Sequence, residues 1–232
     1  MFIKNTLQGR RFVIPDIHGC YRTFLTLVEK LEITKADQLF LLGDYISRGS
    51  GVKATIDHIL NLQALDYQVY PIRGNHEQSF LETASSANLK ILKAQAKRSK
   101  CLDLLDYEGQ LKPRYAQFLQ KLPFYLELDN FYLVHAGLNF MIEEPLQDMQ
   151  AMVWIRTISE TGAKWLKDKT LIHGHTPQQL FFIEKAIAEK RQILNLDNGC
   201  VYVNRNNMGN LLALNIDTFE LIIQQNIDPI SI

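Results

Sequence analysis

Features that mark specialised classes of protein are largely missing from this sequence. The 25 Lys and Arg residues equal the 25 Asp and Glu residues, so no basic excess indicates a nucleic-acid binder. The 3 cysteines, Cys20, Cys101 and Cys200, have no regular spacing and no CxxC pair. They therefore predict neither a disulfide framework nor a structural zinc site. We expect no nucleic-acid duplex among the partners.

Long apolar runs are also missing. None approaches the roughly 18 residues that a membrane span needs, and the first residues lack the apolar core and cleavage site of a signal peptide. We therefore expect a cytoplasmic protein without a membrane partner. With 232 residues, of which 47% are apolar, the chain is typical of a single domain spanning 1–232. The sequence does not set the oligomeric state.

The first third of the chain alternates short apolar runs with stretches of helical period. Residues 11–15, 38–42 and 68–72 are typical of buried strands. Apolar residues recur at helical spacing after Gly19 and over 52–65. This β-α-β-α-β pattern predicts a parallel sheet with right-handed crossovers.

Beyond the third run the pattern changes. Another helix is expected from His76, and residues 88–115 are more polar and helical, which indicates a helical insertion or cap. This segment carries a basic cluster that either forms a solvated helix face or recruits an anionic substrate: Lys90, Lys93, Lys97, Arg98 and Lys100. The second half is expected to be mostly β, with a helix within 154–167 and strands at 125–128, 131–134, 170–173, 193–196, 201–203, 211–216 and 221–224.

Side chains that bind metal ions follow the predicted strands at the point where each strand ends. Asp16 and His18 follow the first, Asp44 the second, and Asn75 the third. These positions are 28 and 31 residues apart, counting from Asp16 to Asp44 and from Asp44 to Asn75, close to the roughly 30 residues of a βαβ unit. Because ligands bind at the carboxyl ends of parallel strands, we expect these side chains to lie side by side.

Two histidines complete the candidate set, since His135 follows the strand at 131–134 and His175 follows the one at 170–173. Two carboxylates, one amide oxygen and three imidazoles suit manganese, iron or zinc better than calcium. Six such groups are too many for one tetrahedral zinc, but they fit two ions bridged by Asp44. We therefore expect two divalent metal ions, with manganese as the leading choice and iron or zinc as alternatives.

Three neighbouring residues add further chemistry. Arg48 lies four residues after Asp44 and is a candidate phosphate clamp, since a guanidinium group matches phosphate geometry. His76 is a candidate proton donor to the leaving group. Glu77 either orients His76 or starts the next helix, where an acidic residue favours the helix dipole. Asp197 is expected to support the site without binding metal.

These strings resemble the metallophosphoesterase (calcineurin-like) superfamily, and within it the serine/threonine phosphoprotein phosphatase-like branch. The signature of that branch is DxHG, GDxxDRG, GNHE, HAG and GH. The matching segments begin at Asp16, Gly43, Gly74, His135 and Gly174. The order and spacing hold from about residue 11 to 200, and five motifs in register are far more specific than any one alone.

The resemblance implies a four-layer αββα sandwich and a role for each candidate residue. Asp16, His18 and Asp44 would hold one ion, whereas Asn75, His135 and His175 would join Asp44 around the other. Arg48, Arg156 and Asn75 would bind the substrate phosphate, and His76 would act as the general acid. Metal-bound hydroxide would be the nucleophile, as expected where two ions share a water.

The substrate is less well defined, because Ser47 stands where the signature has aspartate. That aspartate pairs with the histidine after Asn75 in protein phosphatases, whereas symmetrical diadenosine tetraphosphate hydrolases lack it. Those hydrolases, however, carry aspartate in place of Glu77. The leading prediction is a phosphoserine/phosphothreonine hydrolase. The alternatives are a hydrolase of diadenosine tetraphosphate or another small phosphate compound, and a non-catalytic metal-binding scaffold.

Overall fold

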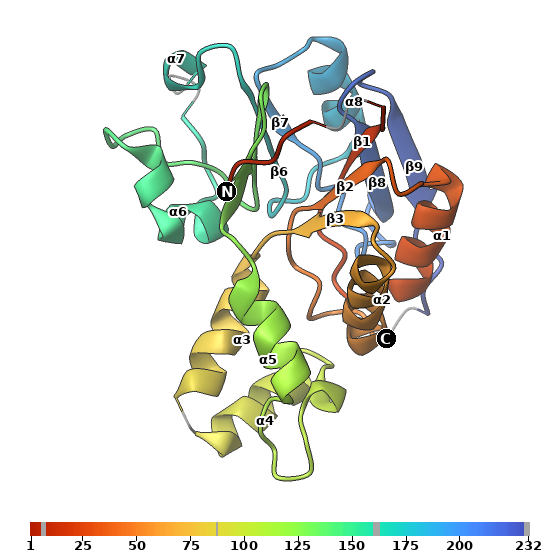
Figure 1. Ribbon diagram of the computed structural model, residues 1–232, viewed down its shortest axis with the longest axis vertical. Coiled ribbons are helices and arrows are strands. Elements are labelled where there is room, and N and C mark those ends of the chain that lie inside the picture. Colours follow the sequence, from red (N-terminus) through yellow and green to blue (C-terminus); the bar gives the residue numbers. More distant parts are fainter. Residues whose placement is uncertain (6–7, 87, 160–162, 230–232) are drawn as a thin grey trace.

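The computed structural model describes residues 1–5, 8–86, 88–159 and 163–229, and it contains two β-sheets flanked by helices (Figure 1). The larger sheet has the strand order β3-β2-β1-β8-β9. Its first three strands are parallel, whereas β8 is antiparallel to β1 and to β9. The bounds are β1 (Arg11–Ile14), β2 (Gln38–Leu41), β3 (Gln68–Pro71), β8 (Asn210–Asn215) and β9 (Leu221–Gln225).

The smaller sheet has the order β4-β5-β6-β7. Strand β4 is antiparallel to β5, and β5, β6 and β7 are parallel. The bounds are β4 (Tyr125–Glu127), β5 (Phe131–Val134), β6 (Thr170–His173) and β7 (Ile193–Asn195). Each sheet thus contributes three parallel strands, and the loops that follow these strands carry the candidate site residues.

The two sheets pack face to face through alternate side chains of their strands. Val13 of β1 and Phe40 of β2 belong to the same buried cluster as Leu133 of β5 and Ile172 of β6. Side chains one position along a strand point the opposite way, so Phe12 enters a second cluster against the helices. Burial on both faces explains why these strands are continuous apolar runs in the sequence.

Helices cover the outer face of each sheet (Figure 1). Helix α1 (Tyr21–Leu31) and helix α2 (Val52–Ala64) pack on the larger sheet through its outward-facing apolar side chains. Helix α6 (Met149–Trp154) and helix α7 (Ala163–Leu166) pack on the smaller sheet. The predicted four-layer αββα sandwich is therefore confirmed.

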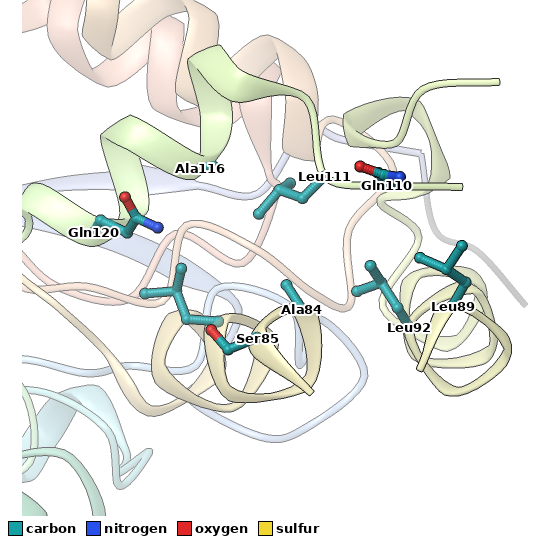
Figure 2. Close-up of a pocket in the computed structure, with 9 residues that line it drawn as sticks. Ala84, Ser85, Leu89, Leu92, Gln110, Leu111, Ala116 and Gln120 are labelled. Carbon is teal, nitrogen blue, oxygen red and sulfur yellow. The ribbon is translucent and has the colours of Figure 1, made fainter. Parts of the chain in front are cut away.

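A group of helices projects beyond the sheets between β3 and β4 (Figure 1). It contains α3 (Asn75–Ser85), α4 (Leu89–Arg98), the 3-10 helix η1 (Leu102–Leu104) and α5 (Pro113–Lys121). Figure 2 shows a pocket among these helices, into which Ala84, Leu92 and Leu111 point from three different segments. None of the residues that line it is a candidate site residue.

Two expectations need correction. The predicted strand at 201–203 is wrong: Gly199 has a φ of 63° and its carbonyl accepts a turn hydrogen bond of 2.8 Å from the amide of Tyr202. The turn overrides the strand propensity of the Val-Tyr-Val string. Helix α8 (Leu180–Ala188) was not predicted. In the described ranges, no helix combines the length and apolarity needed to cross a membrane.

Candidate active site

The six predicted metal-binding side chains converge at one edge of the sandwich, where the parallel strands of both sheets end. The tightest group surrounds the Asn75 side-chain oxygen, which lies 3.0 Å from His135 Nε2 and 3.1 Å from His175 Nδ1. The two ring nitrogens are themselves 3.1 Å apart. Asp44 Oδ1 lies 3.6 Å from His135 Nε2, so residues of both sheets meet at this group.

A second group forms around the other carboxylate oxygen of Asp44. Oδ2 lies 3.6 Å from His18 Nε2 and 3.9 Å from His76 Nε2. Asp16 Oδ2 is 4.0 Å from the same nitrogen of His18. Asp44 therefore directs one oxygen toward each group, which is the arrangement that a bridging carboxylate requires.

The buried donor atoms of this cluster fit divalent cations. Asp16 Oδ2 is buried and has no hydrogen-bond partner in the described structure, although an unpaired buried carboxylate is costly. His135 Nδ1 lies 2.9 Å from the carbonyl oxygen of Leu42. Because a carbonyl only accepts, Nδ1 is assigned the proton, and the lone pair on Nε2 points at the cluster, as in most metal-binding histidines. Neighbouring ring nitrogens at 3.1 Å also favour a cation between them.

The electrostatics of the cluster support the same conclusion. Burial, reinforced by Asp197 and Asp44, raises the pKa of Asp16 well above its usual value. Burial also lowers the pKa of His18 and His135, so the imidazoles are neutral and available as ligands. Two bound cations would favour the charged carboxylates and neutral rings that this arrangement provides.

Strained backbone holds three of the candidate ligands in place. His18, Asp44 and His175 have φ values of 49°, 52° and 71°, in the left-handed region that residues other than glycine rarely adopt. Such strain concentrates at functional sites. Two glycines are required by close approach: a Cβ on Gly74 would lie 2.2 Å from Asp44 Oδ1, and one on Gly174 would lie 2.2 Å from Asp16 Oδ1.

The sequence profile of the calcineurin-like phosphoesterase family matches residues 9–214. The chain belongs to this family. It is therefore a metallophosphoesterase, and the Asp and His groups described above are those that could hold the divalent metals used by the family. The assignment of each residue to one ion or the other stays a prediction.

Several curated relatives of this metallophosphoesterase are bis(5'-nucleosyl)-tetraphosphatases. It is 26% identical to the asymmetrical bis(5'-nucleosyl)-tetraphosphatase PrpE of Geobacillus sp. (strain WCH70), covering 82% of this chain and 85% of that protein. It is 28% identical to the symmetrical bis(5'-nucleosyl)-tetraphosphatase of Glaesserella parasuis serovar 5 (strain SH0165), covering 55% of this chain. That match spans only 44% of the symmetrical enzyme.

Solved structures share the fold at low sequence identity. A structure provisionally assigned as a diadenosine tetraphosphatase gives a TM-score of 0.67 at 19% identity and covers 96% of each chain. A serine/threonine phosphatase from Saccharomyces cerevisiae with similarity to human phosphatase PP5 gives 0.66 at 16% identity, covering 99% of this chain and 84% of that one. At these identities the likeness shows the fold alone.

Both predicted clamp arginines act electrostatically on the candidate ligands of this metallophosphoesterase, Arg48 on His18 and Arg156 on His175. The Arg48 guanidinium donates a hydrogen bond to the Tyr202 hydroxyl. Burial is the main cause of the lowered pKa of His18, and the charge of Arg48 lowers it further. Arg156 is exposed. Burial of His175, together with the charge of Arg156, lowers the pKa of His175 to about 4. Neither guanidinium forms an ion pair within the described part of the chain, so both are available to an anion.

His76 lies in the metallophosphoesterase site without a carboxylate partner of its own. Asp44 is the one acidic residue within ion-pair distance of it among those described, and Ser47, the residue at the expected aspartate position, is buried. Burial, followed by the charges of Arg48 and Arg98, lowers the pKa of His76 to about 4. The ring is therefore neutral near pH 7, and its place beside His18 makes it a seventh candidate ligand that the sequence did not suggest as one.

Glu77 has a role that the sequence left open. Its carboxylate is fully buried and accepts hydrogen bonds from the backbone amides of Asp44, Tyr45, Ile46 and Gly74 at 2.8 to 3.1 Å. The side chain therefore supports the Asp44 loop rather than the His76 ring. The contact with Gly74 is the capping-box contact of an acidic residue at the start of α3, whereas no local sequence signal indicates the other three, because those donors follow β2.

Asp197 follows β7 and lies beside the same cluster. Its Oδ1 accepts a 2.7 Å hydrogen bond from the amide of Gly199, whereas the buried Oδ2 has no partner in the described structure. Burial raises the pKa of Asp197 to about 6, and its charge contributes to the raised pKa values of Asp16 and Asp44. The residue thus adjoins the metal groups, and its supporting role stays a prediction.

Proposed function

We propose that this metallophosphoesterase hydrolyses phosphoanhydride bonds of dinucleoside polyphosphates such as diadenosine tetraphosphate. The observation that carries the proposal is the convergence of Asp16, His18, Asp44, Asn75, His135 and His175 around two candidate ion positions. When bound, two divalent ions supply a water of lowered pKa and positive charge for the transferred phosphoryl group. The protein supplies the ligands, and Arg48 and Arg156 would bind the phosphoryl oxygens as their charge develops.

The surroundings of His76 favour an anhydride over a serine or threonine ester. Cleavage of a phosphoester expels an alkoxide, which needs a proton from a general acid. Cleavage of an anhydride expels a phosphate group whose own pKa is about 6, so it leaves without protonation near neutral pH. With Ser47 at the position of the usual aspartate, no dedicated carboxylate maintains a proton on His76. The site is thus better suited to a leaving group that needs no acid.

The relatives support the same substrate class. PrpE of Geobacillus and PrpE of Anoxybacillus flavithermus (strain DSM 21510 / WK1) match over most of both chains, and each is a bis(5'-nucleosyl)-tetraphosphatase. The match to PrpE of A. flavithermus covers 90% of this chain and 91% of that protein at 25% identity. A shared substrate class is the simplest explanation of likeness over the full site.

Hydrolysis of phosphoserine and phosphothreonine is the second candidate, and Glu77 is the residue that favours it. Symmetrical tetraphosphate hydrolases usually carry aspartate there, whereas the protein phosphatase signature has glutamate. In this chain, however, the Glu77 carboxylate is occupied by four backbone amides and faces no open pocket. Its identity therefore reflects the support of a loop more than the choice of substrate.

A direct comparison of substrates tests the proposal. With manganese added, kcat/KM is measured for diadenosine tetraphosphate, a phosphothreonine peptide and p-nitrophenyl phosphate. We expect the dinucleotide to be preferred by at least an order of magnitude, and chromatography of the products shows which anhydride is cleaved. A preference for the phosphopeptide would overturn the substrate class. Equal and negligible rates for wild type and Asp44→Asn on all three would indicate a non-catalytic scaffold.

A further inference from the structure

We propose that Arg98 and Lys100, from the helices that project beyond the sheets, form with Arg48 and Tyr202 a binding site for the phosphates beyond the one being cleaved. This inference rests on the proposed function, because it assigns the part of the site that holds the rest of a polyphosphate chain. It also gives residues 88–115 a role as a substrate-binding cap. The ligand is a nucleoside polyphosphate bound through several negative charges.

A pocket connects the cap with the candidate phosphate clamp. It has a volume of about 270 Å³ and includes Arg48, Gly49, Lys100, Tyr202, Asn226 and Asp228 among its lining residues. Arg48 and Gly49 both line this pocket, and the Gly49 amide donates a 2.8 Å hydrogen bond to the carbonyl of His18. The pocket therefore adjoins the loop that carries His18. A chain of phosphates that starts at the metal groups would continue into it.

The end of α4 brings two cations to this region. Arg98 is the last residue of the helix, two residues before Lys100, which lines the pocket. The chain then turns at Lys100, whose φ is 52°, while buried Ala96 accepts a 2.9 Å hydrogen bond from the amide of Cys101. This anchored turn fixes the backbone from Arg98 to Lys100 beside the pocket.

These cations lack acidic partners. Among the described residues, none of the ion pairs involves Arg48, Arg98, Lys100 or Arg205, whose guanidinium lies 4.1 Å from the centre of the Tyr202 ring. The one acidic residue that lines the pocket is Asp228. Its carboxylate accepts from the hydroxyl and the amide of Thr23 at 2.7 and 2.9 Å, and from the amide of Arg22 at 3.1 Å.

A local excess of positive charge in a chain of zero net charge attracts anionic ligands. A phosphopeptide offers one phosphate, which Arg48 and Arg156 together suffice to bind. A dinucleoside tetraphosphate offers several further charges at the spacing of a short chain, and these would occupy Arg98 and Lys100 in turn. The pocket therefore distinguishes polyphosphates from single phosphate esters.

The same helix provides a matched control. Lys90 and Lys93 lie near the start of α4, and they are exposed, as are Arg98 and Lys100. At 1.5 Å per residue, Lys90 is displaced from Arg98 by roughly 12 Å along the helix axis. The double variants Arg98→Ala/Lys100→Ala and Lys90→Ala/Lys93→Ala remove the same charge from α4 and the turn that follows it, so general effects of charge affect both alike.

The first measurement is the ratio of kcat/KM for diadenosine tetraphosphate to that for p-nitrophenyl phosphate. Loss of charge-assisted hydrogen bonds should raise KM for the dinucleotide by about tenfold or more. We expect Arg98→Ala/Lys100→Ala to lower the ratio by at least that factor, whereas Lys90→Ala/Lys93→Ala leaves it unchanged. An unchanged ratio in the first variant, or an equal fall in both, would overturn the inference.

A binding measurement separates this inference from the proposed function. Calorimetric titration with a methylene-bridged analogue of diadenosine tetraphosphate reports Kd without turnover, and Arg98→Ala/Lys100→Ala should weaken binding by about tenfold. Equal Kd values for wild type and variant would refute the pocket whatever the activity. Weaker binding by the variant, together with no hydrolysis of diadenosine tetraphosphate by wild type, would refute the proposed reaction and leave the pocket in place.

Discussion

The carboxylate of Glu77 accepts a 2.8 Å hydrogen bond from the backbone amide of Asp44. The residue that faces both groups of candidate ligands is thus held through its backbone by a side chain from α3. Asp44 Oδ1 in turn accepts a 3.1 Å bond from the amide of His76. These reciprocal contacts fix the loop after β2 against the start of α3, and they explain how a left-handed conformation persists at Asp44.

Replacement of Glu77 should therefore destabilise the protein. In Glu77→Gln the amide group would present a donor to backbone donors, and the charge that strengthens the remaining hydrogen bonds would be lost. We expect the free energy of unfolding to fall by roughly 3 kcal/mol, the scale of a lost buried charged hydrogen bond. Thermal unfolding in the presence of a chelator measures this, with the exposed Glu82→Gln as control. Equal melting temperatures for Glu77→Gln and wild type would show that these contacts are not supportive.

Removal of the Arg48 guanidinium should slow the reaction and leave the stability of the fold nearly unchanged. Arg48 is exposed and forms no ion pair within the described residues, so its loss leaves no buried group unpaired. We expect Arg48→Ala to lower kcat/KM by about 10²- to 10³-fold, as for other lost donors to developing charge. Arg114→Ala, which removes an exposed guanidinium paired with Asp57, should retain wild-type rates. Similar losses in the two variants would argue against a clamp at Arg48.

Gly174 is predicted to be essential for a steric reason. A Cβ at this position would lie 2.2 Å from Asp16 Oδ1, which also accepts a 2.9 Å hydrogen bond from the amide of His175. We expect Gly174→Ala to displace Asp16 and lower activity by about 10²-fold, the cost of a displacement near 1 Å. Gly109→Ala provides the control, because its φ of 85° makes the substitution strain the backbone while no atom lies within 4 Å of its added Cβ. Full activity in Gly174→Ala would show that the carboxylate position is not critical.

The loop before β2 should contribute a pH-dependent part of the stability. Burial alone would raise the pKa of Asp37, but hydrogen bonds from Arg10 and Thr34 outweigh it and lower the pKa to about 2. The folded pKa is below the unfolded value of about 3.9, so the stabilisation is present above pH 4 and is lost as pH falls to about 2. We expect Asp37→Asn to cost about 2 kcal/mol at pH 7.

Unfolding by urea across this pH range checks that expectation. The difference in unfolding free energy between wild type and Asp37→Asn should shrink as pH falls from 4 to 2. A difference that stays constant over this range would mean that the Asp37 contacts with Arg10 and Thr34 are not the cause.

The positions of the site residues were predictable because they depend on the spacing of strands. Asp16 and Asp44 follow neighbouring parallel strands, and the regular length of a βαβ unit places them side by side whatever the side chains between them. His135 and His175 follow parallel strands of the second sheet, whose packing on the first was implied by the family resemblance. The strand pattern therefore predicted which site residues of the first sheet lie together, and the resemblance predicted that the histidines of the second sheet join them.

The details that the sequence did not provide depend on side-chain direction. The position of His76 in the group with His18, and of Glu77 beneath the Asp44 loop, follows from how α3 begins. Within the basic cluster, Lys100 lines the pocket that also contains Arg48, whereas the composition alone made all five cations equivalent. The turn at Gly199 overrode a strand pattern through one left-handed residue.

Counting bound metal tests the central claim most directly. After dialysis against manganese and removal of free ion, atomic spectroscopy should find two manganese ions per wild-type chain and two in the control Asp66→Asn, whose carboxylate is exposed. Asp44→Asn should retain fewer than one, because the same carboxylate faces both groups. Retention of two ions by Asp44→Asn, or no bound ion in the wild type, would contradict the account.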